Sequence, residues 1–212
     1  MELQQLTDFV RRAARWVRRF RHRCGYGIHS PYAFALVTGV IYERGAYYAY
    51  APLHAERLQS HCTLREKDDQ LLMRLANASG ADNALVWGDE QATALTLKYL
   101  QAGRRHCRFA RVHSQSELDR HLHAPEGATL DFLYLDDPDT AQWAAVWNAL
   151  LPNVGPRTMF VVRGIHRTKQ ARHTWQQLIA DERVRVTFDL HDFGIACFEQ
   201  RLNKEDYVIN YF

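Results

Sequence analysis

The stretch Asp131-Phe-Leu-Tyr-Leu-Asp-Asp137 is a short apolar run that ends in two acids. A helix-like segment, Thr140–Leu151, follows it, and then come a turn, Pro152–Pro156, and a second apolar run, Met159–Val162. Strand, helix, turn and strand in this order are typical of the parallel βαβ unit of a doubly wound sheet. Because ligands bind such sheets at the carboxyl ends of the strands, the acids of the first run are candidate site residues.

Apolar runs alternate with helix-like segments over most of the remaining chain. Strands are predicted near residues 84–88, 106–113, 131–136, 158–163, 184–190, 194–199 and 206–211, and helices near 91–102, 115–122, 140–151 and 168–181. The segment Val184–Phe198 is typical of a tight antiparallel pair that closes an otherwise parallel sheet. The sequence therefore predicts an α/β fold with a Rossmann-like, mostly parallel sheet over residues 81–212.

The first 80 residues are predicted to form a helical cap, with an amphipathic helix over 2–22 and further helices near 32–42, 53–62 and 66–78. Ser30 is the expected N-cap of the second helix, with Pro31 at its first position. Five arginines flank the apolar stripe of the first helix: Arg11, Arg12, Arg15, Arg18 and Arg19. Such a helix either packs its stripe on the domain or contacts a nucleic acid or an anionic membrane surface.

The composition limits the class of protein. No apolar run approaches the roughly 20 residues that span a bilayer, and arginines interrupt the apolar positions near the N-terminus, so we expect no signal peptide. The four cysteines lie far apart, without a CxxC pair, which indicates a reducing compartment and favours a cytoplasmic location. The 11 histidines show no HExxH spacing, and no metal site is predicted.

Several short segments, taken in order, carry a family resemblance. They are Gly27-Ile-His-Ser-Pro-Tyr-Ala-Phe34, Tyr47-Tyr-Ala-Tyr50, Leu133-Tyr-Leu-Asp136, Leu151-Pro-Asn-Val154, Ile165-His166 and Asp189-Leu-His-Asp-Phe-Gly194. Their order and spacing resemble small bacterial proteins of the class I S-adenosylmethionine (SAM) methyltransferase superfamily, distantly related to catechol-type O-methyltransferases. The resemblance implies a Rossmann-like methyltransferase domain that binds SAM and holds a methyl acceptor in line with it.

The resemblance also assigns candidate residues. The cofactor-binding set is Trp87, Gly88, Asp89 and Ala92 in the loop after the first strand, His113 after the second and Asp136 after the third. The catalytic set is Asp136 and His166 on the acceptor side, with His29 under an N-terminal lid. Each catalytic candidate has an alternative interpretation: Asp136 as a turn or helix-cap acid, His166 as a hydrogen-bonded surface residue, and His29 as the cap of a neighbouring group.

Four features depart from the family pattern. The glycine-rich loop is reduced to Gly88, with the acid Glu90 beside it, and the second strand ends at His113 without the usual ribose-binding acid. A single unit, His106–Leu122, replaces two strand–helix units and aligns with either of them. Arg163 stands where relatives carry acids, which argues against a divalent metal.

Two functions remain open, and the sequence does not decide whether the chain is an enzyme. In the first, it is a SAM-dependent, metal-independent methyltransferase-like protein with a degraded SAM-binding loop and weak or lost activity. In the second, it is a non-catalytic interaction module that binds a protein or an anionic surface through the Arg-rich helix. An ion pair between Arg163 and Asp136 or Glu90 would indicate a closed site.

Overall fold

The computed structural model describes residues 14, 17, 19–22, 25–60, 62–122, 129–136 and 140–211, with the backbone alone for 140–144. Most of the predicted N-terminal helix lies outside the described residues, and so do Arg11, Arg12, Arg15, Arg18 and Asp137. No helix in these ranges is long and apolar enough to cross a membrane.

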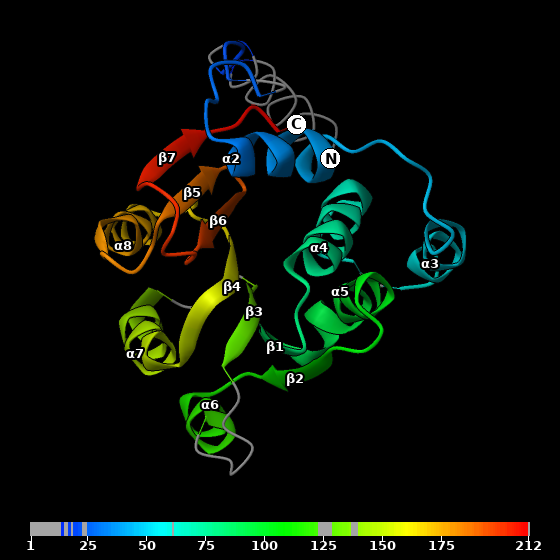
Figure 1. Cartoon of the computed structure of the whole chain (residues 1–212). Helices are drawn as coiled ribbons and strands as arrows, with labels where there is room; N and C mark the ends of the chain where they lie inside the picture. Colours follow the sequence, from blue (N-terminus) through cyan, green and yellow to red (C-terminus); the bar gives the residue numbers. More distant parts are fainter. Residues whose placement is uncertain are drawn as a thin grey trace.

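The described chain alternates helices and strands in the predicted order (Figure 1). The helices are α2 (Pro31–Leu36), η1 (Val37–Ile41), α3 (Tyr50–Arg57), α4 (Glu66–Ser79), α5 (Glu90–Gly103), α6 (Gln115–Leu122), α7 (Thr140–Leu150), η2 (Leu151–Asn153) and α8 (Lys169–Ala180). The strands are β1 (Asn83–Trp87), β2 (Arg108–Val112), β3 (Leu130–Leu135), β4 (Val154–Arg163), β5 (Val186–Asp189), β6 (Phe193–Cys197) and β7 (Glu205–Val208).

The strands form one sheet in the order β2-β1-β3-β4-β6-β5-β7. Strands β2, β1, β3 and β4 are parallel, and β6 lies antiparallel between β4 and β5. The edge strand β7 pairs in parallel with β5. Helices cover both faces of the sheet (Figure 1). The predicted Rossmann-like α/β fold and its antiparallel C-terminal pair are therefore confirmed.

The pairing of β2 decides between the two alignments of His106–Leu122. Strand β2 runs directly beside β1, with Trp87 opposite Val112. It therefore takes the place that the second strand has in a doubly wound sheet, directly beside the first. In the part of the chain that the structure describes, no strand lies beyond β2 at this edge.

Alternate residues of the strands enter two separate cores. Along β1, Ala84 and Val86 face the side of α2, α4 and η1, where they pack with Phe132 and Val161. The intervening residues, including Trp87, face the side of α6, α7 and α8. Because both faces are covered, the central strands are almost wholly apolar.

The helices that precede the sheet share its first core. Ser30 caps α2 as predicted, since its hydroxyl accepts a hydrogen bond from the backbone N–H of Ala33. The Nε of Arg74 in α4 donates to the carbonyl of Val40, 2.8 Å away, and so ties α4 to η1. Helix α4 ends at Gly80, in the left-handed region, at the boundary predicted between cap and sheet domain. That division stays a prediction.

Gly103→Ala should destabilise the fold. A Cβ at Gly103 would overlap the Met73 carbonyl of α4 and lie 2.9 Å from its carbon, and backbone gives way less easily than a side chain. We expect the free energy of unfolding in urea to fall by about 3 kcal/mol. Gly39→Ala, in η1, is the matched control because a Cβ there meets nothing within 4 Å. Equal stability of the two variants would contradict this packing.

Candidate functional site

An ion pair joins the carboxyl ends of β3 and β4. The Nη1 of Arg163, the last residue of β4, lies 2.6 Å from Oδ1 of Asp136, the residue after β3. Their side chains are 15% and 7% exposed. This is the arrangement that the sequence analysis connected with a closed site.

Two further residues hold this pair in place. The hydroxyl of Tyr134 donates to Oδ1 of Asp136 over 2.8 Å. Burial, and then the nearby Asp136 charge, raise the pKa of Tyr134 well above its ordinary value, so the hydroxyl keeps its proton. Arg163 also donates from Nη2 to the carbonyl of Thr63 and from Nη1 to its hydroxyl, at 2.9 and 3.3 Å. The pair is thereby tied to the loop before α4.

Gly88 lies against Asp136, where a Cβ at position 88 would be 3.0 Å from the Asp136 Cβ and 2.7 Å from Thr93 Cγ2. The next residue, Asp89, is the N-cap of α5, since its carboxylate accepts hydrogen bonds from the backbone N–H groups of Gln91 and Ala92. The donors at this helix start therefore already have a partner within the chain.

Arg111 of β2 offsets the negative charge of Glu90. Arg111 lies 3.4 Å from the Glu90 carboxylate and donates to its backbone carbonyl over 2.9 Å. The loop between β1 and α5 is thereby fastened to the neighbouring strand. Glu90, the acid that departs from the family pattern in this loop, therefore has a basic partner in Arg111.

In the described part of the chain, the side chains of two other predicted cofactor residues, Trp87 and His113, make no hydrogen bond with Asp136, although the Trp87 carbonyl accepts from the Asp136 backbone N–H over 2.8 Å. Trp87 is 5% exposed and packs in the core beneath α6, α7 and α8. Its side chain therefore lies on the face of the sheet opposite to α2, α4 and η1. His113 is exposed and its Nδ1 lies 3.0 Å from the Glu117 carboxylate, one turn along α6.

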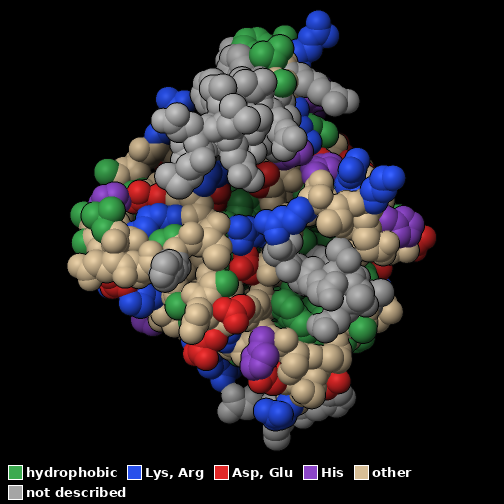
Figure 2. Space-filling model, turned by 180° about the vertical axis from the view of Figure 1, so that it is seen from behind, with side chains coloured by type: hydrophobic (Ala, Val, Ile, Leu, Met, Phe, Trp, Pro, Cys, Tyr) green, Lys and Arg blue, Asp and Glu red, His purple; other side chains and the backbone are tan. Residues whose placement is uncertain are grey.

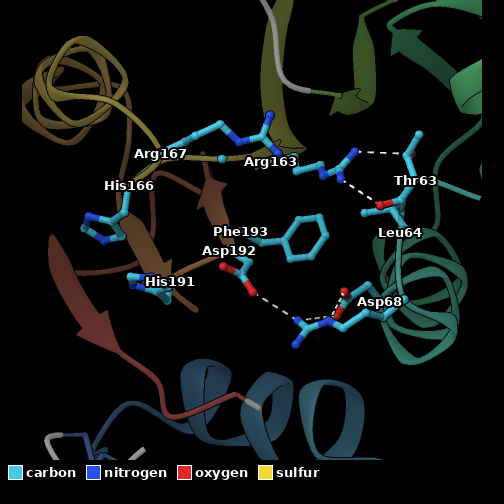
Figure 3. Close-up of a pocket in the computed structure, with 11 residues that line it drawn as sticks. Thr63, Leu64, Asp68, Arg163, His166, Arg167, His191, Asp192 and Phe193 are labelled. Carbon is cyan, nitrogen blue, oxygen red and sulfur yellow. Dashed lines mark hydrogen bonds and ion pairs between the residues drawn. The ribbon is translucent and has the colours of Figure 1, made fainter. Parts of the chain in front are cut away.

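A cavity of about 350 Å³ opens beside the end of β4. Figure 3 shows His166 and His191 on one side of it, and Thr63, Leu64 and Asp68 on the other. The other lining residues are Arg65, Arg163, Gly164, Arg167, Asp192 and Phe193. The cavity thus brings together the end of β4, the turn between β5 and β6, and the loop before α4.

His166 lines this cavity and is held by Asp189, whose Oδ2 lies 2.6 Å from its Nε2. Both Nη atoms of Arg19 lie 3.1 Å from the other carboxylate oxygen. Burial alone would raise the pKa of Asp189, but the hydrogen bonds from His166 and Arg19 lower it to about 2. The ring of His191 stacks on that of His166, with centroids 5.0 Å apart.

His29 is exposed and is not among the residues that line this cavity. The two residues before it, Gly27 and Ile28, border a separate hollow together with Asp206–Ile209 of the β7 region. No hydrogen bond or ion pair between His29 and either Asp136 or His166 is found among the described residues. Its catalytic role and its place under a lid stay predictions.

The sequence analysis missed several residues of the site. Thr63 lies 100 residues from Arg163, and nothing in the sequence around it indicates the contact. Asp189 and His191 lie in the hairpin segment that contributed to the family resemblance, but no role was assigned to them. His191 has a φ of +73°, a backbone conformation that is uncommon outside glycine and common near turns.

Among the residues that the structure describes, no group of three or more His, Cys, Asp or Glu side chains could hold a metal ion. The Asp136 carboxylate instead contacts the Arg163 guanidinium. A cation beside Asp136 does not favour binding of a second one.

Asp189→Asn should remove pH-dependent stability. Because the pKa of Asp189 is about 2 in the folded protein, below its ordinary value of 3.8, the ionised group stabilises the fold above about pH 4. That contribution is lost as the pH falls toward 2. We expect the variant to be less stable by roughly 2 kcal/mol at pH 6, and by much less at pH 2.5, in denaturant unfolding.

The matched control for that experiment is Glu182→Gln, which removes an exposed carboxylate. It should change the free energy of unfolding little at either pH. A loss for Asp189→Asn that is the same at pH 6 and at pH 2.5 would refute the ionic contribution.

A scan of protein-family models finds no match, and no curated protein matches the chain. Solved structures do match. Cofactor-bound Rv0187 from MTB has a TM-score of 0.54 and 15% identity, covering 79% of this chain and 95% of that one. The SAH-bound methyltransferase PaMTH1 from Podospora anserina has a TM-score of 0.51 and 9% identity, covering 81% and 97%.

The O-methyltransferase from Bacillus cereus, in complex with SAH, has a TM-score of 0.49 and 12% identity over 72% of this chain and 91% of that one. Identities this low bear on the fold alone. The chain has the fold of the class I SAM-dependent methyltransferases.

Proposed function

We propose that this chain is a metal-independent, SAM-dependent methyltransferase-like protein whose cofactor site is held closed, so that SAM binding and methyl transfer are weak or lost. The fold supports the first part, since similar structures were solved with cofactor or SAH bound. The local geometry around Asp136 supports the second part.

The ion pair between Arg163 and Asp136 is the observation that carries the proposal. A carboxylate at the end of a central strand can hold a ligand only if its oxygens are available to the ligand's donors. Here Oδ1 of Asp136 already accepts from Arg163 and from Tyr134. A ligand that binds this oxygen must therefore displace a guanidinium that is only 15% exposed.

The remaining residues fit the cofactor in part. Gly88 keeps the close backbone approach that a cofactor loop requires, next to the start of α5. The carboxylate of Asp89, however, caps that helix. The acid beside the end of β2, Glu117, already accepts from the backbone N–H of His113 and contacts its ring, so a ribose diol would have to compete for it. The fit supports binding that is weak rather than tight.

On the acceptor side, we propose that Asp136 and His166 face the methyl acceptor. His166 lines the cavity, and Asp189 fixes its Nε2, which leaves Nδ1 for a further hydrogen bond. No contact of the described residues adds support for His29 in this role.

The alternative, an interaction module that uses the Arg-rich helix, gains nothing from Arg19. That side chain is 15% exposed and is bound to Asp189 within the molecule. The other four arginines of the predicted contact surface lie outside the described residues.

Arg163→Met should strengthen SAH and SAM binding. The substitution removes the cation that occupies Asp136 and keeps an unbranched, apolar side chain that replaces the aliphatic part of the arginine. In calorimetric titration we expect wild type to give a dissociation constant of millimolar order or no saturable heat. We expect the variant to bind at least about tenfold more tightly, a gain of roughly 1.4 kcal/mol.

Arg183→Met is the matched control, because Arg183 pairs with Asp181 beyond the end of α8 and does not line the cavity. It should bind both ligands as weakly as wild type does. Micromolar SAM binding by wild type would disprove a closed site. A folded Arg163→Met protein without any gain would show that the ion pair is not what closes it.

A further inference from the structure

The cavity beside β4 presents basic side chains to its interior. Arg65, Arg163, Arg167, His166 and His191 all line it, and they come from three different segments of the chain. We propose that this cavity binds a small anionic ligand, a carboxylate or a phosphate, with Arg163 as its principal contact. This site is separate from the cofactor loop, and its occupation does not require SAM.

The two acids that line the cavity are both held by a single arginine. Arg65 contacts the Asp68 carboxylate through Nε and Nη2, at 2.7 and 3.1 Å, and its Nη2 also lies 3.1 Å from Asp192. Arg65 thus offsets one of these two negative charges, and the lining as a whole holds three arginines against two aspartates. Dashed lines in Figure 3 mark these contacts, which connect Asp192 with Asp68 through the arginine.

The other acids of this region lie behind the basic groups. Asp136 contacts Arg163, and Asp189 contacts His166, but neither acid lines the cavity. Each carboxylate therefore orients a basic side chain whose remaining surface faces the interior. Figure 2 shows acidic and basic side chains intermingled on the face opposite to that of Figure 1. Because Arg163 and His166 line the cavity while their acidic partners do not, the arrangement of the charged groups favours an anion, rather than the net charge.

Arg163 has donor capacity left for a ligand. A guanidinium carries five N–H groups. The contacts of Arg163 with Asp136 and Thr63 use Nη1 and Nη2, and its Nε has no hydrogen-bond partner among the described residues. Asp136 and a ligand in the cavity would compete for the same positive charge. Binding of an anion should consequently become stronger when the carboxylate of Asp136 is removed.

The histidine pair adds donors on the opposite wall. The ring of His166 is engaged through Nε2 by Asp189, and His191 stacks on it. The contact with Asp189 fixes the orientation of the His166 ring at the cavity wall and leaves its other nitrogen, Nδ1, for a ligand.

The dimensions of the cavity restrict the ligand. A volume of about 350 Å³ is near the lower end of the range for small-molecule sites, which is roughly 300–1,000 Å³. Leu64 and Phe193 supply apolar lining. The fitting chemistry is a compact molecule with one anionic group and a small apolar body, and benzoate and inorganic phosphate are suitable probes of its two possible head groups.

The test is calorimetric titration of the full chain with benzoate and, separately, with inorganic phosphate, each at constant ionic strength. We expect saturable binding of at least one probe by wild type. Arg163→Met should weaken that binding at least about tenfold, while Arg183→Met leaves it unchanged. Asp136→Asn should strengthen it several-fold, because Arg163 loses its competitor while the asparagine oxygen can still accept from Tyr134.

The opposite effects of the two site variants keep the test decisive if Arg163→Met fails to fold. Tighter binding of benzoate would identify a carboxylic acid as the ligand class, and tighter binding of phosphate would identify a phosphate ester. No saturable heat with either probe would overturn the proposal. So would equal weakening by Arg163→Met and Arg183→Met, or unchanged binding in Asp136→Asn. The two proposals remain distinguishable, because Arg163→Met should strengthen the binding of SAH and weaken the binding of the anionic probe.

Discussion

A guanidinium that is mostly buried at the end of a sheet has to keep its carboxylate partner. Removing one member of such a buried pair typically costs about 3–5 kcal/mol, because the other charge is left without compensation. Arg163 and Asp136 meet this condition, and they end the two adjacent central strands. The geometry of the whole strand edge follows from them, since Thr63 is bound to the same guanidinium and Gly88 packs on the same aspartate.

This constraint also explains why one edge of the sheet combines a loop that resembles a cofactor site with a cavity lined by basic groups. Parallel strands bring their carboxyl ends to one edge, which is where ligands of such folds bind. In this chain the acid of β3 is engaged by the arginine of β4. The same arginine lines the neighbouring cavity. The positive charge of Arg163 is therefore shared between the Asp136 carboxylate and the neighbouring cavity.

The sequence was sufficient for the fold because its signals are local and repeat many times. Apolar runs placed every strand to within a few residues, and Ser30 and Pro31 marked the start of α2. The possible pairing of Arg163 with Asp136 could be named from their positions at adjacent strand ends. The face of Trp87 was not readable, because the whole run Ala84–Trp87 is apolar and only the folded sheet places Trp87 with Leu85 in the core beneath α6, α7 and α8.

The contacts that complete the site were beyond the sequence because they join distant segments. Arg19 and Asp189 are separated by 170 positions and Arg163 and Thr63 by 100, with no periodic pattern to connect them. Arg19 was one of five similar arginines, and only the folded chain distinguishes it from the other four. Burial, and not the residue type, decides which charges must find partners, and burial at such points depends on how whole elements pack.

The two strand-end acids show how similar pairs can have different consequences. Asp136 and Asp189 each bind one arginine, yet Asp136 binds the arginine that lines the cavity, whereas Asp189 binds Arg19, which does not. Asp189 also contacts His166, and it is this histidine that lines the cavity. A permanent cation and a titratable ring therefore face the same space, each fixed by a carboxylate behind it. Since an orienting carboxylate restricts the motion of its partner, the donors of this space are partly preorganised before any ligand enters.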